Sequence, residues 1–131
     1  MIVPSKEQIE KVRYEYPKGI RVELIKIDDI QAPPVGTKGT VKGVDGIGSI
    51  MVSWDNGSSL SVVYGEDICK RVTSIPIDVI HQILAIRDSG VTNMFDTNAV
   101  QYYANERGFY ELVNYMIDHK KEYAHFIMTG E

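Results

Sequence analysis

The sequence predicts an α+β protein in which a short N-terminal helix precedes a small antiparallel β-barrel, and a three-helix unit follows. Glycines and an Asn-Gly turn separate short alternating strand patterns between Gly36 and Tyr64. After Ile75 the apolar residues recur at helical spacing instead. A chain of 131 residues with 44% hydrophobic and 24% charged residues is long enough to bury a core and has an ordinary globular composition.

The first elements are a short helix and a strand. Ser5 and Gln8 have the spacing of a capping box, in which each residue satisfies a free amide of the first helical turn. We expect this helix to reach about Tyr14 and to stop before Pro17, because the residue that precedes a proline is pushed away from helical angles. Residues 20–24 then alternate between apolar and charged side chains, which predicts a half-buried strand.

The rest of the barrel follows a long loop. Two prolines within residues 28–36 deny this segment both a helix and a central strand. Glycines at Gly46 and Gly48 permit a tight connection between two further strands, and Asn56-Gly57 is a strong hairpin signal. We therefore expect the remaining strands over residues 37–44, 49–55, 60–64 and 68–72, the last of which closes the barrel.

The second half of the chain predicts three helices. The first begins after Pro76 and ends at Gly90, and the second begins at a capping Asp96 and ends at Gly108. The third and longest is expected over 110–128. The expected organisation is an N-terminal helix and linker over 1–17, an SH3-like barrel over 18–74 and a helical unit over 75–131.

The distribution of charge limits the choice of partners. Residues 1–75 carry ten basic and ten acidic residues, whereas residues 76–131 carry four and eight, so the net charge of −4 lies in the second half. Because phosphate contacts need a positive surface, duplex nucleic acid is not an expected partner. No apolar run approaches the roughly 18 residues that cross a bilayer. We expect a cytoplasmic protein with no membrane partner.

Motifs for catalysis and for metal binding are missing from the sequence. His81, His119 and His125 do not have the spacing of metal ligands, and no Gly-Lys-Ser/Thr follows the glycines. Asp28-Asp29 and Glu66-Asp67 could supply an acid and a base, but adjacent side chains normally point apart. We therefore predict a protein that is not an enzyme, with no catalytic residue, metal or cofactor, and keep hydrolase activity as the alternative.

Candidate ligand-binding residues come from the loops and from the aromatic residues. In an SH3-like barrel the first long loop lies beside the ligand groove, although Asp28 and Asp29 could simply solvate a turn. Trp54 is either a plug of the core or a floor on which a ligand ring stacks. Eight of the twelve aromatic residues follow residue 90, which predicts docking on the barrel, on a second copy or around a flat ligand. The candidates are Asp28, Asp29, Trp54, Asn56, Tyr64, Arg87, Asn93 and Phe95.

Two stretches carry a resemblance to known families. The N-terminal stretch contains Tyr-Pro-Lys-Gly (16–19), Gln-Ala-Pro-Pro-Val-Gly-Thr-Lys-Gly-Thr-Val (31–41), Trp-Asp-Asn-Gly-Ser (54–58) and Tyr-Gly-Glu-Asp (64–67). It resembles an uncharacterised SH3-like family that is common in bacteriophages, prophages and mobile elements of Gram-positive gut bacteria. The C-terminal stretch contains Asn-Met-Phe-Asp (93–96), Gly-Phe-Tyr-Glu-Leu-Val (108–113) and His-Phe-Ile-Met-Thr-Gly (125–130), and is similar to a second uncharacterised family of the same genomes. The resemblance implies an origin and a fold, and transfers no catalytic residue.

Two functional hypotheses follow. In the first, a phage accessory protein sequesters a small nucleotide-derived immune signal or blocks a host factor, and so counters a host defence in the host cytoplasm. In the second, the protein is an adaptor whose barrel grips a peptide or a nucleic-acid strand and whose helices dimerise. Both hypotheses predict binding without chemical change, and we expect the protein to be a homo-oligomer.

Overall fold

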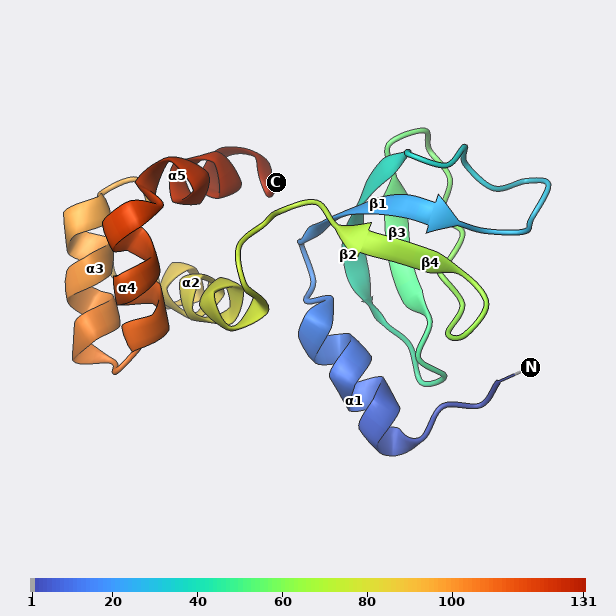
Figure 1. The fold of residues 1–131 in the computed structure, drawn as a ribbon, viewed down its shortest axis with the longest axis horizontal. Coiled ribbons are helices and arrows are strands. Elements are labelled where there is room, and N and C mark those ends of the chain that lie inside the picture. The colour runs from blue at the N-terminus through green and yellow to red at the C-terminus, as the bar shows by residue number, and fades with distance from the viewer. Residues whose placement is uncertain (1) are drawn as a thin grey trace. The chain divides into compact units, whose positions relative to one another are not determined.

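The computed structural model describes residues 2–131, which form two compact units (Figure 1). One unit extends to Val72 and the other runs from Thr73 to Glu131. The first unit holds α1 (Lys6–Glu15), β1 (Arg21–Lys26), β2 (Lys38–Val44), β3 (Ile50–Trp54) and β4 (Ile68–Arg71). The second holds α2 (Ile77–Ser89), α3 (Thr97–Glu106), α4 (Tyr110–Asp118) and α5 (Lys120–Thr129). These elements confirm the predicted α+β class.

The four strands form one antiparallel sheet in the order β3-β2-β1-β4, so β3 and β4 lie at its edges. The register shifts once within the β2–β3 pair, between Val41 and Gly43, and once within the β1–β4 pair, between Leu24 and Lys26. Shifts of this kind bend and twist a sheet. The sheet nevertheless stays open, and this differs from the closed barrel that the strand patterns predict.

The sheet stays open because the expected strand over 60–64 does not form. Only Val62 pairs with β3, where its amide and carbonyl both bond to Ile50. The carbonyl of Leu60 instead accepts from the indole of Trp54, and the amide of Val63 donates to the carboxylate of Asp67. The backbone groups on either side of Val62 are therefore used in loop contacts, and a strand cannot propagate from this single bridge.

The core of the N-terminal unit lies on one face of the sheet. Alternate residues of β1 and β3 are buried, including Val22, Leu24, Val52 and Trp54. Gly39 on β2 permits the close approach of β3. A Cβ atom at this position would lie 2.6 Å from Val52 Cγ1 and 2.9 Å from Trp54 Cε3, which is closer than packed carbon atoms can approach.

We expect Gly39→Ala to lower the free energy of unfolding of the N-terminal unit by about 1–3 kcal/mol, because overpacking forces a core to shift. Gly46→Ala is the matched control, since a Cβ atom there would meet nothing within 4 Å. It should change stability by less than about 0.5 kcal/mol. Urea unfolding followed through the fluorescence of Trp54 measures both. Equal stability of the two variants would contradict the packing argument.

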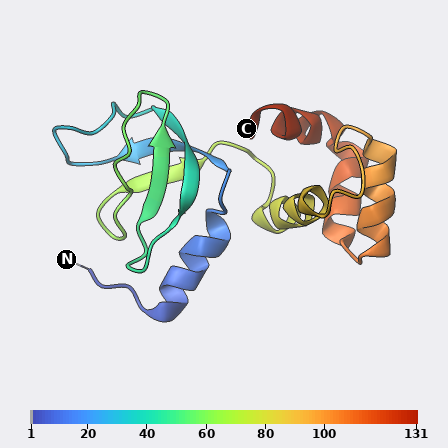
Figure 2. The same cartoon turned by 180° about the vertical axis from the view of Figure 1, so that it is seen from behind.

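Helix α1 begins and ends as the sequence predicts. Ser5 accepts from the amide of Gln8, and the Gln8 side chain accepts from the amide of Ser5, so the predicted capping box is confirmed. At the other end the Tyr16 hydroxyl donates to the carbonyl of Cys69 over 3.2 Å, and Arg71 donates to the carbonyl of Glu15. These bonds attach the end of the helix to the edge strand β4. The helix also contacts β2 (Figure 2).

The helices of the C-terminal unit follow predicted signals. Gly90 ends α2 in the left-handed conformation with φ of 68°, and the Asp96 side chain accepts from the amide of Ala99 at the start of α3. Figures 1 and 2 both show α3 beside α4, and the two helices are in contact. On α2, Gln82 accepts from the amide of Leu112 in the first turn of α4. None of the helices in residues 2–131 has the length and hydrophobicity that would allow it to span a membrane.

The expected single helix over 110–128 is two helices, so this unit has four helices within the described chain rather than three. The break lies at His119, whose φ of −130° and ψ of 35° are not helical. The His119 ring stacks on Tyr115 at a centroid distance of 4.5 Å. The change of direction lets α5 bury Tyr123 and Phe126, and the Tyr123 hydroxyl donates to the carbonyl of Met94 over 2.6 Å.

Candidate functional site

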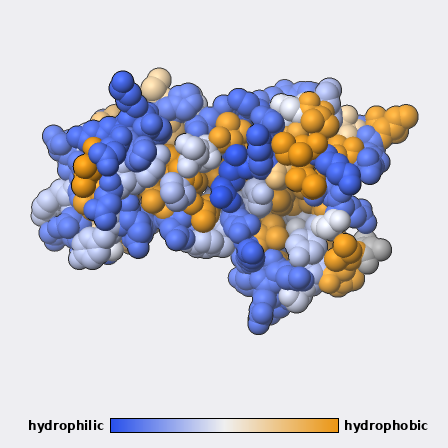
Figure 3. All heavy atoms as spheres, in the orientation of Figure 1, coloured by the Kyte–Doolittle hydropathy of each residue, from blue (hydrophilic) through white to orange (hydrophobic). Residues whose placement is uncertain are grey.

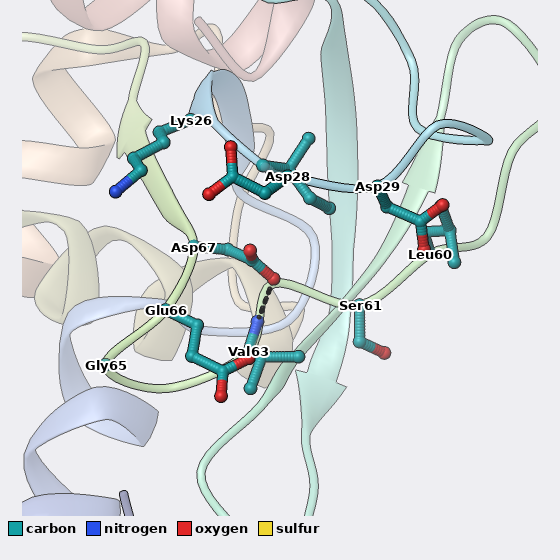
Figure 4. Close-up of a pocket in the computed structure, with 10 residues that line it drawn as sticks. Lys26, Asp28, Asp29, Leu60, Ser61, Val63, Gly65, Glu66 and Asp67 are labelled. Carbon is teal, nitrogen blue, oxygen red and sulfur yellow. Dashed lines mark hydrogen bonds between the residues drawn. The ribbon is translucent and has the colours of Figure 1, made fainter. Parts of the chain in front are cut away.

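An acidic pocket lies at one end of the sheet of the N-terminal unit (Figure 4). Its volume is about 530 Å³. One wall is the end of β1 with the loop that follows it, and the other is the segment that leads into β4. Because Lys26 pairs with Ile68 in the antiparallel register, the residues after β1 and those before β4 meet at the same end of the sheet. The lining residues are Lys26, Ile27, Asp28, Asp29, Leu60, Ser61, Val63, Gly65, Glu66 and Asp67.

Negative charge dominates this pocket. Of the described residues that line it, four carry carboxylates and one carries an ammonium group. Asp29 accepts from the amide of Gln31 over 2.8 Å, and Asp67 accepts from the amide of Val63 over 2.9 Å. These two carboxylates hold the walls in shape, while Asp28 and Glu66 add further charge at the exposed rim. The arrangement attracts a cationic group and repels an anion.

An apolar pocket of about 180 Å³ lies next to the acidic pocket. The two pockets share the turn over residues 63–67. Val12 and Tyr16 of the N-terminal helical segment form one side, and the opposite side is formed largely by Ile50, Val62, Ile68 and Cys69. Burial raises the pKa of the Tyr16 hydroxyl and of the Cys69 thiol to about 12 each. The thiol therefore stays protonated at neutral pH, and the apolar pocket has no thiolate nucleophile.

Two further pockets lie in the part of the chain that the structure describes. Ile2, Val3 and Pro4 form one side of a small apolar recess near Tyr64. In the C-terminal unit, a pocket of about 240 Å³ is lined by Thr73, Ser74, Lys121, Glu122, His125 and Glu131. Across residues 2–131, no group of three or more histidine, cysteine or acidic side chains has an arrangement that could hold a metal ion.

The structure brings some of the predicted residues of the N-terminal unit together. Asp28 and Asp29 both line the acidic pocket, and Tyr64 lines the apolar pocket beyond the turn. Trp54 is 2% exposed, and its indole donates to the carbonyl of Leu60 over 2.8 Å, so it belongs to the core and offers no open face for stacking. Asn56 closes its own turn by accepting from the amide of Ser58.

The predicted residues of the C-terminal unit have local partners. Arg87 forms an ion pair of 3.2 Å with the adjacent Asp88. Asn93 accepts from the amide of Phe95 over 2.9 Å, which shapes the turn before α3. The Phe95 ring remains 57% exposed.

Sequence reasoning missed most of the second wall of the acidic pocket. Glu66 and Asp67 were recognisable only as an adjacent acidic pair, and nothing in the sequence placed them opposite Asp28 and Asp29. The antiparallel pairing of β1 with β4 is what brings the two acidic pairs to one end of the sheet. A prediction that paired these two strands could have found the pocket.

Comparisons with known families give one match within each of the two compact units. A family model described as a domain of unknown function, DUF4314, matches residues 5–72, just over half of the chain. The chain belongs to this family. A second domain of unknown function, DUF5049, matches residues 77–131 of this DUF4314 protein. The order of the two domains is consistent with an uncharacterised two-domain family. Neither the curated proteins nor the solved structures contain a match to the chain.

Proposed function

We propose that this DUF4314 protein binds a protein partner without changing it chemically, and that its acidic pocket captures a lysine or arginine side chain of that partner. The observation that carries the proposal is the excess of carboxylates in a pocket of about 530 Å³. Two of these carboxylates are fixed by backbone amides, so the site is partly organised before a ligand arrives. Such preorganisation lowers the entropic cost of binding.

A nucleotide-derived signal is the other ligand that the sequence suggests, and the geometry supports it less well. The phosphates of a nucleotide would face four carboxylates and only the ammonium group of Lys26. Phosphates and carboxylates are both negatively charged, so they would repel one another in this pocket. Trp54 cannot provide the expected stacking floor while its ring is buried in the core.

The resemblance to phage and prophage families supports a more specific role. We propose that the gene belongs to a phage or another mobile element, and that the blocked partner is a host factor met in the host cytoplasm, as a counter-defence or host-takeover protein requires. An adaptor with dimerising helices is the second candidate. The side chains of Tyr102, Tyr110 and Ile117 on α3 and α4 are each more than half exposed, and their burial by a second copy of the chain would favour such a dimer.

The test uses blocked glycine-serine peptides that carry one arginine, with citrulline as the uncharged isostere. We expect the full chain to bind the arginine peptide more tightly, with chemical shift changes at the acidic pocket and an affinity that falls as salt is added. Asp28→Asn combined with Glu66→Gln should weaken this binding several-fold, since exposed ion pairs contribute about 0.2–1 kcal/mol each. Asp118→Asn combined with Glu106→Gln removes the same charge from exposed positions on the helices and is the matched control.

Three results would contradict the proposal. The first is equal binding of the arginine and citrulline peptides. The second is a rise in melting temperature with a panel of nucleotides but not with the peptides, which would restore the nucleotide-derived signal as the ligand. The third is a chemically altered peptide or nucleotide after incubation, which would show that the protein is an enzyme.

A further inference from the structure

The turn from Val63 to Asp67 separates the acidic pocket from the apolar pocket and belongs to both. Val63, Gly65 and Asp67 line each of the two pockets. Gly65 has a φ of 78° and no side chain, and a Cβ atom there would lie 2.7 Å from Ile2 Cδ1. The dividing wall is therefore backbone at this point, with the half-exposed side chain of Ile2 packed against it.

The apolar pocket is ready to receive an uncharged group. Two of its polar side chains already have partners, because the Tyr16 hydroxyl donates to the carbonyl of Cys69 and the Asp67 carboxylate accepts from the amide of Val63. The remaining surface is formed largely by aliphatic side chains such as Val12, Ile50 and Val62. An apolar cavity of about 150 Å³ can hold a benzene ring. A volume of about 180 Å³ is therefore enough for one branched or aromatic side chain.

Hydrophobic residues also surround this part of the molecule. Figure 3 shows hydrophobic residues gathered among hydrophilic ones on the surface of the N-terminal unit. Ile68 lines the apolar pocket, and a neighbouring recess that shares Val63 and Tyr64 with it is lined by Ile2, Val3 and Ile47. These four isoleucine and valine side chains are each more than half exposed. A partner that covers this surface would gain from apolar burial as well as from charge pairing.

We propose that the acidic pocket and the apolar pocket are two subsites of one peptide-binding surface, and that its occupant is an extended segment of a partner protein with a basic residue and a nearby leucine or aromatic residue. This inference rests on the proposed function and specifies the partner. Charge complementarity selects the basic residue, the apolar lining selects its neighbour, and the shared turn sets the two subsites side by side. An extended segment suits this surface because it can direct nearby side chains into separate pockets.

Nuclear magnetic resonance titrations of the full chain with four kinds of blocked glycine-serine peptide test this inference. The peptides carry one arginine, one leucine, both at varied spacing, or neither. We expect one spacing of the double peptide to bind about tenfold more tightly than the peptide with arginine alone. In wild-type protein, the methyl signals of Ile50, Val62 and Ile68 should shift with the double peptide and not with the arginine peptide.

A pair of variants on α1 provides the control. Val12→Phe fills the apolar pocket and should abolish the tenfold advantage while the affinity for the arginine peptide stays unchanged. Lys11→Phe adds the same ring at the exposed neighbouring position and should keep the advantage. If the arginine peptide binds but leucine adds nothing at any spacing, or if the methyl signals do not move, the two-subsite inference is wrong and the proposed function stands. If no arginine peptide binds, the proposed function fails, and this inference fails with it.

Discussion

Trp54→Ala is expected to lower the free energy of unfolding of the N-terminal unit by about 3–5 kcal/mol, the usual cost of removing a large buried aromatic side chain. Trp54 is 2% exposed at the end of β3, and its ring lies where Gly39 lets the neighbouring strand approach. A loss of this size is a large fraction of the 5–15 kcal/mol that a typical domain has in total. Much of the unit should therefore be unfolded or readily opened at room temperature.

The same substitution should also loosen the acidic pocket. The indole of Trp54 donates to the carbonyl of Leu60, which fixes the segment that supplies Leu60 and Ser61 to the pocket wall. Trp54→Phe keeps most of the apolar burial and loses this hydrogen bond, so it should cost less than Trp54→Ala and still raise amide exchange around Leu60.

Hydrogen exchange of the full chain, read by mass spectrometry, measures both effects without relying on tryptophan fluorescence. We expect faster exchange in residues 20–62 of Trp54→Ala and unchanged exchange in α2 to α5. Ile30→Ala removes a fully exposed apolar side chain from the same unit and should alter stability by less than about 0.5 kcal/mol. Unchanged exchange in Trp54→Ala would show that the ring contributes little to the core.

Features encoded by neighbouring residues could be predicted from the sequence. The capping box of Ser5 and Gln8, the cap at Asp96 and the left-handed Gly90 each depend on a few adjacent positions. Their physical cause is local, because a helix end must satisfy amides and carbonyls that have no partner within the helix. The sequence therefore identifies these ends before anything is known of the tertiary structure.

Features that depend on distant partners could not be predicted in this way. The segment 60–64 has an alternating pattern, yet Trp54 and Asp67 take the backbone groups that a strand would need. No glycine or proline lies near the helix break at His119, so no helix-breaking residue predicts it. It is accompanied by the burial of Tyr123 and Phe126, which is a tertiary contact and leaves no local signal.

The residues of the candidate site also fall into those that local sequence predicts and those that depend on distant contacts. Asp28 and Asp29 were predicted because they begin a long loop, which is a local property. Glu66 and Asp67 complete the pocket only because β1 pairs with β4, whose residues are more than forty positions apart in the chain. Trp54 remained ambiguous because the sequence shows an aromatic residue at a strand end but not the carbonyl of Leu60 that binds its indole.

Tyr123→Ala is expected to lower the free energy of unfolding of the C-terminal unit by about 3–5 kcal/mol, since it removes a fully buried ring from α5. Tyr123→Phe isolates the hydroxyl group, which donates to the carbonyl of Met94 over 2.6 Å. Loss of this bond leaves a partly buried carbonyl with one partner fewer and should cost about 1–2 kcal/mol at neutral pH. Tyr102→Phe, at a side chain that is 60% exposed, is the control and should change stability by less than about 0.5 kcal/mol.

Alkaline pH provides a second and independent test of this burial. Burial raises the pKa of Tyr123 from 10.0 to about 12, so between these values the hydroxyl ionises in the unfolded chain before it ionises in the folded one. The folded state then binds more protons than the unfolded state, and stability falls as pH rises through this window. Tyr123→Phe lacks this contribution, so its deficit relative to wild type should be largest at neutral pH and should shrink between pH 10 and about 12. Urea unfolding followed by helical circular dichroism at several pH values measures the difference, and a deficit that stays constant across the window would mean that water reaches the Tyr123 hydroxyl in the folded protein.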